Sequence, residues 1–134
     1  MTGSRVIPCL RYRDAKRMIS WLCDTFGFRP QAVYEDCGGV AHAQLTLGDG
    51  MIMLGSLRDD QFSQVQRTPA ALGGTTQSPY LVVADADAIY HSAVAAGAEI
   101  VIEIKDEDYG GRGFSCRDLE GHLWNVGTYD PWKK

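Results

Sequence analysis

The sequence contains the same order of strand, helix and turn signals twice, with corresponding residues 71 positions apart. Pro8 and Pro79 stand at this spacing in two short apolar runs. Gly50 and Gly121 also match, and each follows an acidic residue between two strand-like runs, which is a strong signal for a β-hairpin. A chain duplicated in this way is expected to fold as two similar modules, which would supply two similar half-sites.

Each copy is predicted to form a βαβββ module. In the first copy, Asp14 is the expected N-cap of a helix over residues 15–27, whose apolar residues recur at helical spacing and which Gly27 ends. In the second copy, Asp85 precedes a helix over residues 86–96. The expected strands are residues 5–13, 31–36, 41–47 and 51–54 in the first copy, and 78–84, 99–105, 113–117 and 122–128 in the second.

These elements predict an α+β fold, and the chain length of 134 residues is that of one domain. We expect a single domain over residues 1–134. Its expected parts are a first module at 5–55, a polar, loop-like linker at 56–77, a second module at 78–128 and a tail at 129–134.

The composition narrows the classes of partner. A net charge of −4, from 13 basic and 17 acidic residues, argues against a nucleic-acid surface, because phosphate binding needs clustered Lys and Arg. The four cysteines show no CxxC spacing, which favours reduced thiols and a cytoplasmic location. No run has the length of a membrane span and residues 1–6 lack a signal-peptide core, so we expect no membrane partner.

Four stretches of the chain carry a family resemblance. Residues 7–15, the helix end Phe26-Gly27-Phe28, residues 42–50 and the closing residues 109–124 resemble the glyoxalase, bleomycin-resistance and extradiol-dioxygenase (vicinal oxygen chelate) superfamily. Leu119 departs from the proline common at that place. The resemblance implies two modules whose curled sheets form a concave cavity, usually in a homodimer.

The resemblance also implies where a metal would be held. In the metal-dependent enzymes of this superfamily, the first and last strands of each module supply the ligands, and the matching positions here are Ile7, Leu54, Ser78 and Asn125. A divalent cation needs His nitrogen or carboxylate oxygen, and a shift of one residue at any of these positions brings in no His, Asp or Glu. We therefore expect no metal, no cofactor and no catalytic residue of the usual kind.

Strand alternation then predicts the lining of the cavity, because successive side chains point to opposite faces. If the four matching positions point inward, so do Cys9, Ile52 and Leu123, while Met51, Met53 and Trp124 face the helices. The predicted ligand-binding residues are Arg11, His42, Gln44, Leu54, Tyr80, Tyr109, Arg112, Ser115, Asn125 and Trp132.

Several of these residues also have an ordinary structural interpretation. His42 fits a strand histidine that bonds a neighbouring backbone group better than it fits a base. Tyr109 and Arg112 lie in a glycine-rich segment that suits a lid or a carboxylate site and equally suits an exposed turn. Trp132 could stack on a planar ligand at the mouth of the cavity, or could pin the terminus.

The resulting hypothesis is a metal-free, homodimeric binding protein that sequesters a bulky, partly aromatic natural product, an antibiotic, for resistance or self-protection. The first alternative is a metal-independent lyase or isomerase that uses His42 or Tyr109 as acid or base. The second is a carrier that holds a biosynthetic intermediate. The identity of the ligand, and whether it is only bound or also modified, lie beyond the sequence, as does whether the modules pair within one chain or between chains.

Overall fold

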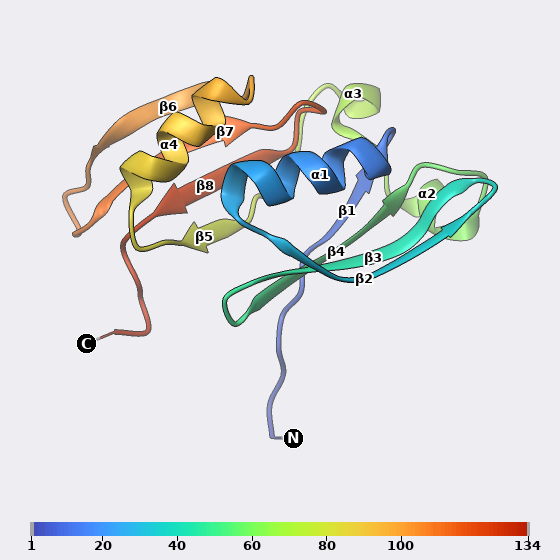
Figure 1. Cartoon of the computed structure of the whole chain (residues 1–134), viewed down its shortest axis with the longest axis horizontal. Helices are drawn as coiled ribbons and strands as arrows, with labels where there is room; N and C mark the ends of the chain where they lie inside the picture. The colour runs from blue at the N-terminus through green and yellow to red at the C-terminus, as the bar shows by residue number, and fades with distance from the viewer. Residues whose placement is uncertain (1, 134) are drawn as a thin grey trace. The chain divides into compact units, whose positions relative to one another are not determined.

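The computed structural model describes residues 2–133, and the chain divides into two compact units, one ending at Thr68 and the other beginning at Pro69. Each unit contains a four-stranded mixed sheet and one long helix, as Figure 1 shows. The predicted α+β class and the two tandem βαβββ modules are confirmed. None of the helices within residues 2–133 combines the length and apolar character that crossing a bilayer requires.

The first unit has the strand order β1-β4-β3-β2. Strand β1 runs parallel to β4, and the other neighbours are antiparallel. Helix α1 packs against one face of this sheet (Figure 1). The elements are β1 (Cys9–Tyr12), α1 (Ala15–Phe26), β2 (Arg29–Asp36), β3 (Gly39–Leu47), β4 (Gly50–Ser56) and a short helix α2 (Gln61–Val65).

Helix α1 has the termini that the sequence predicted. The Asp14 carboxylate accepts a hydrogen bond from the Arg17 backbone N–H at 3.1 Å, which satisfies one of the free N–H groups of the first turn. Gly27 ends the helix at φ +90°, a left-handed conformation that favours glycine. The buried side of α1 meets the buried side of the sheet, and together they form the core of the unit: Leu10, Tyr12, Met18, Leu22, Phe26, Ala43, Leu45, Ile52 and Leu54.

The second unit repeats this topology, with the strand order β5-β8-β7-β6 and helix α4 packed against one face (Figure 1). Its elements are a short helix α3 (Pro69–Leu72), β5 (Tyr80–Val82), α4 (Ala86–Ala95), β6 (Glu99–Asp106), β7 (Arg112–Arg117) and β8 (Leu123–Gly127). The segment expected to be a loop-like linker, residues 56–77, is not loop throughout, because it contains the helices α2 and α3 and its first residue ends β4.

The structural repeat does not keep one spacing throughout. Cys9 pairs with Met53 in the first sheet, and Tyr80 pairs with Asn125 in the second. Strands β1 and β5 are thus 71 residues apart, whereas β4 and β8 are 72 apart. The cause is the last hairpin: four residues separate Thr46 from its partner Met51, and five separate Arg117 from its partner Leu123. The match of Gly50 with Gly121 was therefore wrong by one position.

Asp118 organises the longer hairpin. Its Oδ1 accepts hydrogen bonds from the backbone N–H groups of Glu120 at 2.9 Å and His122 at 3.1 Å. Its Oδ2 accepts a hydrogen bond from the indole N–H of Trp124 at 3.0 Å. Trp124 is fully buried, as predicted, and this carboxylate satisfies its polar atom inside the core.

We expect Asp118→Ala to lower the free energy of unfolding by about 3 kcal/mol, because it removes the charged acceptor of the buried Trp124 indole N–H and of two backbone N–H groups in the hairpin. Urea denaturation followed by circular dichroism measures this loss. Asp49→Ala is the matched control, since Asp49 is an exposed acidic residue in the shorter hairpin. Equal stability of the two variants would contradict the role assigned to Asp118.

Cys116 should be chemically silent in the folded protein. It is fully buried, and desolvation, helped by the charge of Asp118, raises the pKa of its thiol to about 12. We expect iodoacetamide at pH 8 to label the exposed Cys9 and Cys37 and to reach Cys116 only in denaturant, as read by peptide mass mapping.

The same raised pKa predicts the direction of a pH effect. The thiol of an unfolded cysteine has a pKa of about 8.5. Below that pH, the neutral Cys116 thiol makes its full contribution to the free energy of unfolding. This contribution is then lost as the pH rises toward the folded pKa of about 12.

In the labelling experiment, native-state labelling of Cys116 as fast as that of Cys37 would contradict the burial of Cys116.

Candidate functional site

Each sheet has one face covered by its helix and one face that the helix leaves uncovered. We call the uncovered faces the first and second open faces. Cross-strand partners share a face, so the register assigns the side chains. The first open face carries Cys9, Arg11, His42, Gln44, Thr46, Met51 and Met53, and the second carries Tyr80, Val82, Ile102, Ser115, Arg117, Leu123 and Asn125.

The predicted alternation is correct on β1, β3, β5 and β8 and wrong on β4. Ile52 and Leu54, expected to point into a cavity, are each 3% exposed and lie in the core on the side of α1. Met51 and Met53, expected to face the helix, pair with Thr46 and Gln44 and so lie on the first open face. Leu54 is therefore removed from the candidate site, and Met53 takes its place.

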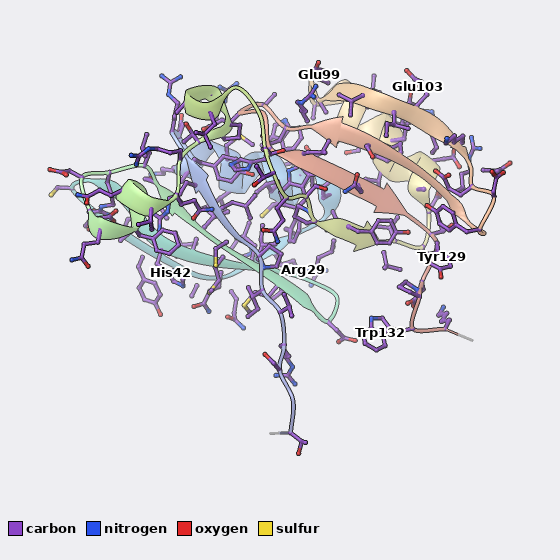
Figure 2. The ribbon with its side chains drawn as sticks, turned by 180° about the vertical axis from the view of Figure 1, so that it is seen from behind. Arg29, His42, Glu99, Glu103, Tyr129 and Trp132 are labelled. Atoms are coloured by element: carbon purple, nitrogen blue, oxygen red, sulfur yellow. The ribbon has the colours of Figure 1, made fainter. Side chains whose placement is uncertain are left out.

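His42 and Gln44 form a polar network at the middle of the first open face. The Nε2 of His42 lies 2.9 Å from the Oε1 of Gln44, and the Gln44 amide donates to the Oε1 of Gln31 at 2.6 Å. Tyr34 stacks on the His42 ring, with centroids 6.3 Å apart. His42 was expected to bond a neighbouring backbone group, but its partner is the side-chain amide of Gln44. Figure 2 shows His42 projecting from the sheet.

Arg11 is fixed at one edge of the first open face. Its guanidinium lies 4.3 Å from the centre of the Phe62 ring and donates to the Ser56 carbonyl at 3.1 Å. Burial lowers the pKa of Arg11, and the charge of Asp60 opposes this effect. Gly55 makes the placement possible, because a Cβ there would lie only 2.7 Å from the Arg11 Nη1.

The second open face has a continuous row of side chains across its four strands. Register partners place Ile102, Ser115, Asn125 and Tyr80 in this row. The Ser115 hydroxyl donates to the Asn125 Oδ1 at 2.7 Å, and the Asn125 amide donates to the Ser78 Oγ at 2.8 Å. The predicted residues Tyr80, Ser115 and Asn125 therefore lie together.

Tyr109 lies in the turn beyond β6 and Arg112 at the start of β7, where strand alternation turns the Arg112 side chain toward the α4 side of the sheet rather than onto the second open face. Tyr109 packs edge-on against Tyr129, with ring centroids 5.0 Å apart. Arg112 binds the carboxylates of Asp87 at 3.0 Å and Asp106 at 3.4 Å, and Asp87 is the main cause of the raised pKa of its guanidinium. Its charge is thus already matched by two carboxylates within the unit.

Tyr129 was not predicted from the sequence, but it contacts two of the predicted residues, Tyr80 and Tyr109. Its carbonyl accepts a hydrogen bond from the Tyr80 hydroxyl at 2.8 Å, and Figure 2 shows it just beyond the end of β8. The only sequence signal for it was its position in the tail that follows the last strand. Trp132, by contrast, is 91% exposed, so its ring does not pin the terminus.

The residues at the implied metal positions do not fit a divalent cation. After the correction on β4 these positions hold Ile7, Met53, Ser78 and Asn125, which offer a hydrocarbon, a thioether, a hydroxyl and an amide. The Ser78 and Asn125 side chains are already hydrogen-bonded to each other. Elsewhere within residues 2–133, no three His, Cys, Asp or Glu side chains gather in a way that could hold a metal ion.

Comparison with known proteins places the chain in a family. Residues 6–126 match the Glyoxalase/Bleomycin resistance protein/Dioxygenase superfamily. The crystal structure of TioX from Micromonospora sp. ML1 is 34% identical, with a TM-score of 0.73 over 93% of this chain and 98% of TioX. A bleomycin resistance determinant encoded on the transposon Tn5 is 18% identical, with a TM-score of 0.64 over 96% of this chain and 99% of its own, and supports the fold alone.

A curated relative, the uncharacterized protein Mb0911c of Mycobacterium bovis, is 33% identical over 90 residues, or 67% of this chain. The match spans 59% of that relative's length. The chain therefore belongs to the glyoxalase/bleomycin resistance protein/dioxygenase superfamily, as the resemblance indicated.

Arg11 can hold its position because residue 55 is a glycine, which has no side chain. We expect Gly55→Ala to displace the guanidinium from the Ser56 carbonyl, because the new Cβ would lie 2.7 Å from the Arg11 Nη1. The end of this flexible side chain can move at little cost, but the Ala41 carbonyl oxygen, 3.1 Å from the new Cβ, must also give way, so we expect a loss of stability of about 1 kcal/mol, at the low end of overpacking. Urea denaturation measures the loss, and the Arg11 side-chain NMR signals report the displacement. Gly74→Ala is the control, because a Cβ there meets nothing within 4 Å. Unmoved Arg11 signals in Gly55→Ala would show that Arg11 is not held as described.

Proposed function

We propose that this protein binds and sequesters a bulky, partly aromatic small molecule, a natural-product antibiotic, without using a metal. The observation that carries the proposal is the chemistry of the open faces. They present neutral hydrogen-bonding groups, among them Gln44, Ser115 and Asn125, beside aromatic and aliphatic side chains. Ligand sites combine apolar surface with a few such polar groups.

The residue types at the four implied metal positions support binding over metal-assisted chemistry. Ile7 and Met53 offer no anionic or imidazole ligand, and Ser78 and Asn125 are held in a closed set of hydrogen bonds with Ser115. Membership of a superfamily named in part for bleomycin resistance proteins adds to this support by analogy.

The proposal includes the setting in which the site works. We place both units in one binding domain, two copies in a homodimer, and the protein in the cytoplasm. The cytoplasmic assignment rests on four cysteines whose spacing does not suit disulfides. The dimer is proposed by analogy with the family, in which a cavity tends to need modules from two chains.

A thermal-shift screen against planar aromatic and peptide antibiotics tests the proposal. One drug class should stabilise the protein, by about 2.7 kcal/mol when the drug is present at 100 times its dissociation constant. Asn125→Leu should weaken that stabilisation, because it removes the amide at the centre of the second open face. Mass spectrometry of the recovered drug should show it unchanged.

Two histidine variants separate binding from catalysis. His42→Ala alters the first open face, whereas His91→Ala alters an exposed histidine on α4 and serves as the control. Turnover of a drug that His42→Ala abolishes and His91→Ala preserves would replace sequestration with the lyase or isomerase hypothesis. The absence of stabilisation by any drug class would also count against the proposal.

A further inference from the structure

A small cavity of about 60 Å³ lies at the end of the second open face. Three tyrosines line it from three separate segments: Tyr80 from β5, Tyr109 from the turn after β6 and Tyr129 from beyond β8. Glu107 and Arg112 line it as well, and all of these residues belong to the second unit. Tyr80 and Tyr109 are among the predicted ligand-binding residues, and Tyr129 joins them around this cavity.

Backbone contacts hold the cavity walls in place. The turn after β6 is closed by a hydrogen bond from the Glu107 N–H to the Gly111 carbonyl at 2.9 Å. Gly111 has φ +76°, and a Cβ on it would lie 2.7 Å from the Tyr129 backbone nitrogen. Only glycine suits this position, because any side chain would push the turn away from Tyr129. The turn that carries Tyr109 is therefore fixed against Tyr129.

The Tyr80 ring is positioned by a second glycine. A Cβ on Gly127 would lie 2.5 Å from the Tyr80 hydroxyl oxygen, so the absence of that atom lets the phenol lie across β8. From there the hydroxyl donates to the Tyr129 carbonyl at 2.8 Å. The Tyr109 and Tyr129 rings meet at an interplanar angle of 86°. Two perpendicular rings and a third, anchored phenol thus surround the space.

The charge around the cavity is negative. The positive charge of Arg112 is matched by Asp87 and Asp106, as described above. Among residues 2–133, no donor forms a hydrogen bond or ion pair with the Glu107 carboxylate, which is half-buried. The pKa of Tyr80 is raised, mainly by desolvation and further by Tyr109, Tyr129, Asp130 and Glu107. An electron-rich aromatic wall beside a free carboxylate attracts cations.

We propose that this cavity is a subsite for a primary ammonium group, held between the tyrosine rings with its charge opposed by Glu107. The inference rests on the proposed function, because it assigns a cationic amine to the small molecule that the second open face binds. A volume of about 60 Å³ suits a primary ammonium with its adjoining methylene.

NMR titration of the full chain with n-butylammonium chloride tests the subsite, with sodium chloride holding the ionic strength constant. We expect saturable shifts confined to the backbone amides of residues 107–113 and 127–130. The neutral analogue 1-butanol should produce no saturable shift there. Saturable binding of 1-butanol with equal affinity would overturn the inference, because the charge would then contribute nothing.

Matched variants assign the charge to one carboxylate. Glu107→Gln should weaken n-butylammonium binding by about tenfold, since interactions with charged groups exceed those with neutral ones. Asp108→Asn changes the neighbouring acidic residue, which does not line the cavity, and should leave the affinity within about twofold. Equal losses in both variants would show a diffuse acidic surface and overturn the subsite.

The ring contribution has its own variant. Tyr109 is 63% exposed, so Tyr109→Ala should fold normally, as the amide spectrum reports, and still lose n-butylammonium binding. Unchanged affinity in Tyr109→Ala would overturn the aromatic part of the inference. These probes contain no antibiotic, so the drug screen remains a separate test of sequestration if they fail to bind. If the probes bind and the drug screen fails, the ammonium site stands without its proposed larger ligand.

Discussion

The structure depends on the fact that each four-stranded sheet is covered by a single helix. Because strand side chains alternate between faces, every strand must place its large apolar groups on the helix side at intervals of two residues. The remaining side chains are then free to differ, and they differ between the units. The first open face holds thioethers and a histidine–glutamine network, whereas the second holds a serine–asparagine network and tyrosines.

Much of the fold could be predicted from the sequence, because local signals and the burial pattern agree. The Asp14 cap, the Gly27 stop and the buried Trp124 all lie where periodicity and capping rules put them. The phase of β4 could not be obtained in this way. Its residues 51–54 are all apolar, so alternation gave no phase. The positions implied by the family resemblance supplied one, and it matched Leu54 with Asn125 at a 71-residue spacing that a single extra hairpin residue makes wrong.

The candidate site was harder to predict, for a related reason. Strand residues such as Gln44, Ser115 and Asn125 lie on the faces of the sheets that alternation predicted. Tyr129 and the two carboxylates around Arg112 were not predicted, because they approach through turns and chain ends that have no periodicity to read. Long-range contacts of this kind depend on the folded path of the chain rather than on local pattern.

The extra residue in the hairpin organised by Asp118 leaves the register of β8 intact. Asn125 stays paired with Ser115 and Tyr80, although it lies one residue further along the chain than its counterpart Met53 in the first unit. A residue added within the paired part of β8 would instead move each following side chain to the opposite face of the sheet. The chain can thus change length in this turn while the second open face keeps its side chains.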